Sequence, residues 1–166
     1  MDFRTYLDNI ENKLKAYFDV YRDHVIKGYK YDLFARYHMR MERYVLMKKA
    51  VIYAMESNEY CLIKHFDDLD SRKLKDYTCL LIESIDELVN PDENHMSSII
   101  TGVLVCDNKP SDDVIKEIER FKYHKGFAFG FKGWVDIRLI LVAINDEYIV
   151  TNKKGKEVKE VYKIQH

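Results

Sequence analysis

The sequence predicts an α+β domain in which a mixed sheet is flanked by helices. Apolar residues recur at helical spacing near the N-terminus and after residue 70. They alternate with polar residues between positions 30 and 66 and form an almost unbroken β-branched run at 99–106. In order, these segments give the succession α-β-β-β-α-β-α-β-β-β. Because no repeat, low-complexity tract or linker interrupts residues 1–166, we expect a single domain.

Residues 1–27 are expected to form an N-terminal amphipathic helix. Asp2 is suited to cap its start and Gly28 to end it. The apolar positions follow alternating steps of four and three along one stripe: Phe3, Leu7, Ile10, Leu14, Tyr17, Tyr21 and Val25. The same spacing suits a coiled-coil seam. Docking of this helix on the sheet and homo-oligomerisation through it are therefore two open alternatives.

Residues 30–151 are expected to hold the mixed sheet and its other helices. Three extended segments are predicted at 31–39, 42–55 and 59–66, with a turn at Ser57-Asn58. Segment 42–55 fits a strand or a helix, because Glu42, Lys49 and Glu56 also share a helical face. An amphipathic helix then begins at residue 70 or 71 and stops before Pro91.

The second half of the chain is predicted to form mainly strands. Residues 99–106 are typical of a strand buried on both faces. The segment Pro110-Ser111-Asp112-Asp113 supplies a cap and first-turn acids for a short helix. Two long strands are predicted at 123–131 and 134–144, and a short one at 148–151. Residues 152–166 are expected to be a charged tail.

Charge and cysteine content narrow the function classes. The 27 basic and 28 acidic side chains nearly cancel, so the chain lacks the basic field with which dedicated nucleic-acid binders attract phosphates. Cys61, Cys79 and Cys106 are too scattered for a disulfide framework or a zinc site, so we expect buried reduced thiols without a metal or cofactor. No apolar stretch suits a signal core or a bilayer span, which favours the cytoplasm over a membrane.

An aromatic segment is the nearest feature to a chemical signature. Residues 125–129 match the first five positions of the RNA-stacking motif K/R-G-F/Y-G/A-F-V-x-F/Y, which then fails at Gly130 and Lys132. The rings would either stack on bases or belong to the core. We expect Phe127, Phe129 and Phe131 to be mainly buried, because three exposed rings would form a large apolar patch.

Basic residues near this segment form a second candidate feature. Lys125, Lys132, Trp134, Lys153 and Lys154 would make a modest nucleic-acid or anion-binding patch if their strands pair. The alternative is a solvated rim balanced by nearby carboxylates.

Two histidines offer a weaker enzyme hypothesis. His65 and His95 have acidic neighbours in the sequence, which would suit proton transfer in a small-molecule enzyme.

The order of elements through Cys106 is similar to the core of the PD-(D/E)XK nuclease fold. That family uses carboxylates to hold Mg²⁺ and a lysine to position water. Here Leu62 stands at the acid position before Lys64, so the motif is broken. The resemblance implies an inactive, nucleic-acid-associated relative, and the residues available for migrated chemistry are Glu42, Glu56, Glu59 and Lys64.

Most of the chain also resembles an uncharacterised prokaryotic protein family. The resemblance lies in residues 34–44, in His95-Met96 with the strand after it, in 129–134 and in 151–157. It brings no known chemistry. With no catalytic set in the sequence and an aromatic surplus suited to an interface, we expect a non-enzymatic binding or assembly module. The nucleic-acid-associated protein is the alternative.

Overall fold

The computed structural model describes residues 1–45, 48–92 and 95–165, and for residues 40–45, 48–55 and 95 it describes the backbone alone. The strands build a seven-stranded mixed sheet in the order β1-β2-β3-β4-β6-β5, with β7 also paired to β6. The elements are α1 (Phe3–Leu14), β1 (Asp19–Ile26), β2 (Tyr29–Val45), β3 (Lys48–Phe66), α2 (Ser71–Leu88), β4 (His95–Cys106), α3 (Asp112–Arg120), β5 (His124–Gly126), η1 (Ala128–Gly130), β6 (Trp134–Ala143), β7 (Tyr148–Thr151), η2 (Lys154–Glu157) and α4 (Lys159–Tyr162).

The predicted α+β class and mixed sheet are confirmed, but the first elements fall on other residues. The N-terminal helix ends at Leu14 instead of near residue 27, and β1 takes its second half. β-branched side chains favour the extended backbone here, and β1 gains the edge of β2 as a hydrogen-bonding partner. Arg22 of β1 then reaches back to the carboxylates of Asp8 and Glu11 on α1, so the two elements form a hairpin-like unit.

Strands β2 and β3 form one long antiparallel hairpin where three extended segments were predicted. Segment 42–55 is divided between the two strands, so its described backbone is extended and the helical alternative is wrong. Ser57 and Asn58 lie inside β3 and pair with Met39 and His38, so the predicted turn is also wrong. Strand pairing on both sides of β3 outweighs the local turn preference of these residues.

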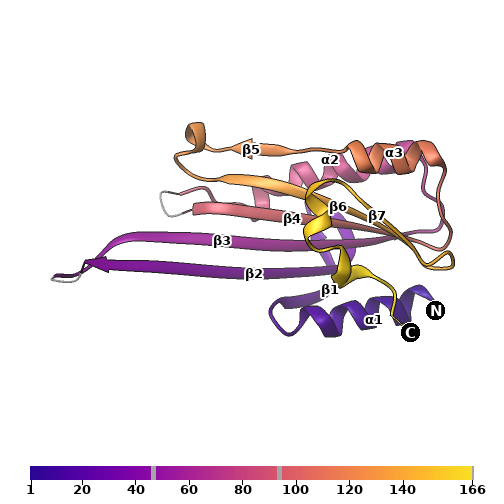
Figure 1. The fold of residues 1–166 in the computed structure, drawn as a ribbon, viewed down its shortest axis with the longest axis horizontal. Coiled ribbons are helices and arrows are strands. Elements are labelled where there is room, and N and C mark those ends of the chain that lie inside the picture. The colour runs from indigo at the N-terminus through magenta and orange to yellow at the C-terminus, as the bar shows by residue number, and fades with distance from the viewer. Residues whose placement is uncertain (46–47, 93–94, 166) are drawn as a thin grey trace.

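Helices cover both faces of the sheet (Figure 1). Neighbouring residues of the central strands alternate between two buried clusters, because successive side chains of a strand point to opposite faces. Leu62 and Leu104 pack with α2 and α3, whereas Ile63 and Val103 pack with α1 and the C-terminal segment. Strand β4 is parallel to both β3 and β6 and is buried at its centre, as its apolar run predicts.

Helix α2 approaches β4 most closely at Gly102. A Cβ atom at this position would lie 2.3 Å from Cδ1 of Leu81 and 3.2 Å from Cε1 of Tyr77. The missing side chain therefore lets two buried residues of α2 rest on the backbone of β4.

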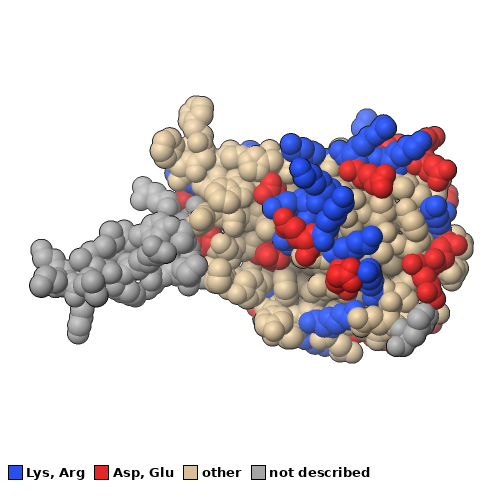
Figure 2. All heavy atoms as spheres, in the orientation of Figure 1, with Lys and Arg blue, Asp and Glu red and all other residues tan. Residues whose placement is uncertain are grey.

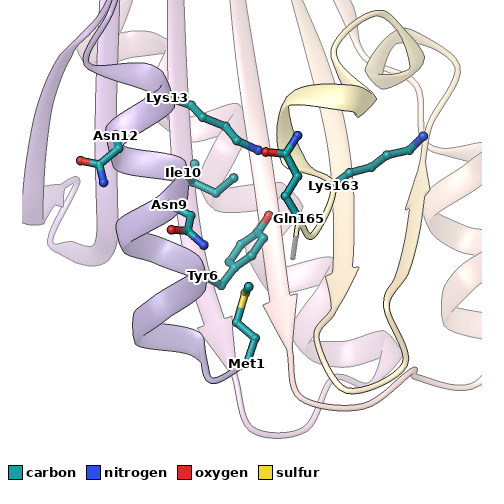
Figure 3. A pocket seen from close by; sticks show the side chains of 8 residues that line it. All are labelled: Met1, Tyr6, Asn9, Ile10, Asn12, Lys13, Lys163 and Gln165. Carbon is teal, nitrogen blue, oxygen red and sulfur yellow. The ribbon is translucent and has the colours of Figure 1, made fainter.

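The C-terminal segment packs on the sheet, so the expectation of a charged tail at 152–166 is wrong. Asn152 and Tyr162 are buried, and the segment between them folds into η2 and α4. The hydroxyl of Tyr6 donates to the carbonyl of Tyr162 at 2.9 Å, and the Lys13 ammonium donates to that of Val161 at 3.0 Å. Figure 3 shows the small cavity of about 300 Å³ along this seam.

Candidate functional site

A two-stranded arm extends beyond the rest of the sheet (Figure 1). We define the arm as residues 40–45 of β2 and 48–55 of β3. Strand β1 pairs with β2 no farther than Arg36, and β4 first meets β3 at Glu56. In the described part of the chain, the arm's strands therefore pair with each other and with no third strand. Their outer edges carry backbone donors and acceptors without a partner strand.

The arm is apolar in composition. Of its fourteen residues, nine are apolar, four are Lys or Arg, and one is Glu42. Four of the six methionines of the chain fall between positions 39 and 55. Methionine is a flexible, polarisable side chain that is over-used at adaptable binding surfaces. Composition and topology both make the arm a candidate contact element.

The aromatic segment is a tight loop instead of a long strand. Strand β5 holds residues 124–126 alone, and the chain then turns through η1 back to β6. Phe127 is half-buried against the α2-side cluster, whereas Phe129 is fully exposed and Phe131 is 87% exposed. The expectation of three mainly buried rings is therefore wrong at Phe129 and Phe131, because the strand ends before they can face the sheet.

Backbone hydrogen bonds hold the loop in place. The amide of Phe127 donates to the carbonyl of Gly133 at 2.9 Å, and that of Gly130 donates to the carbonyl of Phe127 at 2.9 Å. Ala128 and Phe129 both have positive φ, 47° and 57°, a conformation that costs a non-glycine residue about 1–2 kcal/mol. A strained backbone thus holds two phenyl rings in solvent, which points to a role outside the core.

The predicted basic patch is only partly assembled. Lys153 and Lys154 line a cleft of about 550 Å³ between the end of α3, β6 and η2. Lys125, Lys132 and Trp134 are not among its lining residues: Lys125 lies on β5 over the Phe127 ring, 5.5 Å from its centre. Figure 2 shows basic and acidic side chains together over the C-terminal segment.

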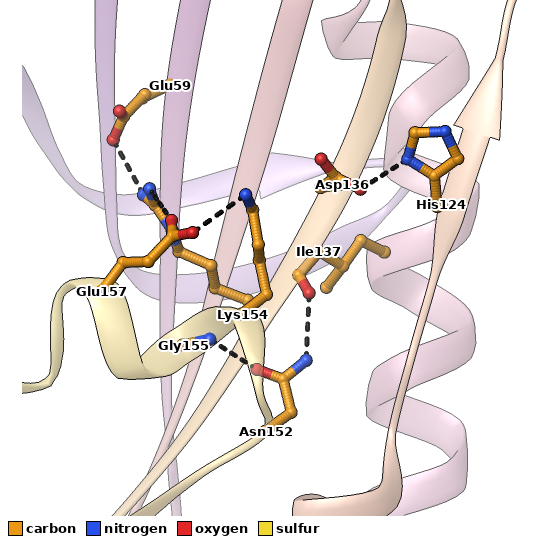
Figure 4. Close-up of polar contacts among 9 residues, drawn as sticks. Glu59, His124, Asp136, Ile137, Asn152, Lys154, Gly155 and Glu157 are labelled. Atoms are coloured by element: carbon orange, nitrogen blue, oxygen red, sulfur yellow. Dashed lines mark hydrogen bonds and ion pairs between the residues drawn. The ribbon is translucent and has the colours of Figure 1, made fainter.

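A charged network that the sequence did not reveal joins Lys154 and Glu157, two lining residues of this cleft, to the sheet (Figure 4). Arg138 of β6 has a side chain only 7% exposed and pairs with Glu59 at 3.1 Å and Glu157 at 2.8 Å. The ammonium of Lys154 adds a 2.9 Å contact to Glu157. Hydrogen bonds from Arg138 and Lys154 lower the pKa of the Glu157 carboxyl below its ordinary 4.5. The two positive and two negative charges of the network balance. Because Arg138 belongs to β6 and Glu157 to η2, their ion pair fixes η2 to the sheet.

The same cleft holds one close imidazole–carboxylate pair. Nδ1 of His124 lies 2.7 Å from Oδ1 of Asp136, and the imidazole is half-exposed. A nucleophile or a third catalytic group at hydrogen-bond distance from this pair is not found among the described side chains. The carboxylate of Asp136 therefore orients the imidazole of His124.

Of the four carboxylate and lysine candidates, the two whose contacts are described, Glu59 and Lys64, do not converge. Glu59 is engaged by Arg138, and Lys64 lies 3.7 Å from Asp32 and over the ring of Tyr29. Glu59 and Lys64 are five positions apart on β3 and so face opposite sides of the sheet. Glu56 has partners of its own, and the side chain of Glu42 lies outside the described residues. Among the described residues, no three His, Cys, Asp or Glu side chains are grouped to hold a metal ion.

The histidine and cysteine expectations have mixed outcomes. Nε2 of His65 lies 3.0 Å from Oδ1 of Asp107, and the imidazole stacks on the ring of Phe3, so both contacts hold His65 in place within the fold. The side chain of His95 is outside the described residues. Cys61 and Cys106 are free and buried as expected, and burial raises the pKa of each thiol to about 12. Cys79 is free but exposed on α2, so its expected burial is wrong.

Comparison with known proteins identifies the family of the chain but no biochemical activity. A family model described as a domain of unknown function (DUF8052) matches residues 2–164, and the chain belongs to that family. No curated protein and no solved structure matches the chain. None of the described helices has the length and apolar character needed to cross a membrane.

Proposed function

We propose that this protein is a non-enzymatic assembly module of the cytoplasm that associates with copies of itself through the β2–β3 arm. The observation that carries the proposal is the arm itself, a largely apolar hairpin whose outer edges meet no third strand in the described residues. Isolated two-stranded hairpins are at best marginally stable in water. The arm gains stability when its edges or faces are covered, and a second copy is always present at equal concentration.

Analytical ultracentrifugation of the full chain over a wide concentration range tests this proposal. We expect concentration-dependent association that the arm variant Val51→Lys weakens by about tenfold or more, because it places a charge in an apolar contact. Val25→Lys is the matched control, since it makes the same change at an exposed strand position outside the arm. A monomer at every concentration up to about 1 mM would refute self-association.

A second candidate function rests on a different observation, the exposed aromatic loop. Phe129 and Phe131 stand in solvent between Lys125 and Lys132, an arrangement suited to stacking on bases while the lysines contact phosphates. This supports a nucleic-acid-associated protein that binds single strands. Fluorescence anisotropy with a labelled single-stranded oligonucleotide would show salt-sensitive binding, weakened when both rings become alanine. Tyr17→Ala removes another exposed ring, one outside the aromatic loop, and is the control.

A further inference from the structure

A groove lined by rings lies at the base of the arm, on the sheet face that α2 covers. Its volume is about 650 Å³. The rings come from β1, β2 and β3, where Tyr21 pairs with Phe34 and Arg36 pairs with Tyr60 across the strands. Six ring-bearing side chains line the groove: Tyr21, His24, Phe34, Tyr37, His38 and Tyr60.

The groove is preformed. Helix α2 ends at Leu88, whose carbonyl accepts a 2.7 Å hydrogen bond from the hydroxyl of Tyr60, so this helix does not cover the sheet beyond that point. The imidazole of His24 stacks on Phe34 with ring centres 4.6 Å apart, and Phe34 stacks on Tyr60 at 6.3 Å. Fixed rings lose little conformational entropy when a partner binds.

We propose that this groove receives the arm of a second copy of the chain. The inference rests on the proposed self-association and names the surface that the arm contacts. Charge supports this occupant: Asp19, Glu87 and Arg36 give the groove one net negative charge, whereas four basic residues against Glu42 give the arm three net positive charges. The opposite net charges of arm and groove favour their encounter. The like net charges of two arms disfavour contact between them.

Side-chain chemistry supports the same occupant. Thioether sulfur makes favourable contacts with aromatic rings at about 5 Å, and four of the six methionines of the chain fall between positions 39 and 55 of the sequence. The eight residues of β3 in the arm extend about 26 Å at the usual strand rise. The groove runs from Phe34 to His38 along β2, about 13 Å on the same scale, so the arm is long enough to cross it.

The position of the groove also allows a closed assembly. Arm and groove are built from consecutive stretches of the same strands, β2 and β3. A two-fold axis between two copies therefore seats each arm on the other copy's groove at the same time. Such reciprocal contacts saturate at two copies and leave no open end for further growth.

The test compares a groove variant with a matched control in the full chain. Tyr21→Lys removes a groove ring and adds a charge that repels the basic arm, whereas Tyr17→Lys makes the same change at a residue 78% exposed outside the groove. We expect sedimentation equilibrium to show association weakened about tenfold or more by Tyr21→Lys and unchanged by Tyr17→Lys. Asp19→Lys, at a largely exposed carboxylate, provides a second groove variant with little risk to the fold.

Mixing two defective variants gives the sharper result. The Tyr21→Lys variant keeps an unaltered arm, and the Val51→Lys variant keeps an unaltered groove. A one-to-one mixture therefore contains one intact arm–groove contact per heterodimer, while each variant alone contains none. We expect the mixture to associate more tightly than either variant alone.

The outcomes separate the two proposals. If the unaltered chain does not associate, the proposed function fails. If it associates but folded Tyr21→Lys and Asp19→Lys behave like the control, or the mixture shows no recovery, the arm contacts another surface and the groove inference is overturned. Circular dichroism establishes that each variant is folded.

Discussion

The guanidinium of Arg138 donates a 2.8 Å hydrogen bond to the carboxylate of Glu157 and thereby fastens η2 to the middle of β6. Arg138 is nearly enclosed, whereas Glu157 is about half-exposed. The contact joins a central strand to a segment that the sequence alone presents as a charged end.

Glu157→Gln is expected to lower the free energy of unfolding by about 1–2 kcal/mol at pH 7, because Arg138 keeps only Glu59 as a charged partner. The native pKa of Glu157 lies below its ordinary 4.5, so its stabilisation is present above pH 4.5 and is lost as the pH falls through the native pKa. Urea unfolding should thus show the gap between wild type and variant narrowing below about pH 4.5. Glu160→Gln, whose carboxylate pairs with Lys163 at the surface, should show a smaller gap.

Asn152→Ala is expected to cost about 3 kcal/mol or more, since it removes four hydrogen bonds at once, three of them buried. The side-chain oxygen accepts from the amides of Leu139 and Gly155, and the side-chain nitrogen donates to the carbonyls of Ile137 and Phe121. Denaturant titration measures the loss. Asn12→Ala, at an exposed position of α1, is the control and should change stability by less than about 0.5 kcal/mol.

Phe129→Ala should leave the melting temperature nearly unchanged, because its ring is in solvent, whereas Phe127→Ala should lower it, because Phe127 packs against the core. Thermal unfolding followed by circular dichroism distinguishes them. Equal losses for the two variants would mean that Phe129 makes stabilising contacts within the domain.

Thiol labelling under native conditions should modify Cys79 rapidly and the other two cysteines slowly. Cys61 and Cys106 are buried with a raised pKa of about 12, so both access and thiolate formation are suppressed. Spectrophotometric titration with a disulfide reagent should show about one fast equivalent, rising to about three in denaturant. Loss of the fast phase in Cys79→Ser would assign it.

The sequence predicts the elements with strong local signals. Helix α2 is capped by Asp70 and carries its apolar stripe, and β4 shows a continuous apolar run, so both were located correctly. It misplaces elements whose identity depends on distant partners. Residues 19–26 fit a helical stripe by spacing, yet they pair with β2, and the pairing is not visible in local periodicity.

The candidate sites were harder to predict, because they depend on how the chain turns. Positive φ at Ala128 and Phe129 ends β5 early and turns the rings outward, and no local pattern announces that backbone. Arg138 could have been noticed as a charge inside an apolar strand, a position where a buried charge requires partners. The concentration of methionines between positions 39 and 55 is likewise visible in the sequence, and methionine is over-used at adaptable binding surfaces.

The close approach of α2 to Gly102 also bears on how the sheet chooses its register. Most strands have one polar face, so a slip by one residue is penalised by exposing apolar groups. Both faces of β4 are apolar at its centre, so polarity does little to discriminate there. A slip would bring the side chain of Thr101 or Val103 under Leu81, where there is room for hydrogen alone. Steric contact with Leu81 thus penalises an alignment that moves Gly102 out from beneath α2.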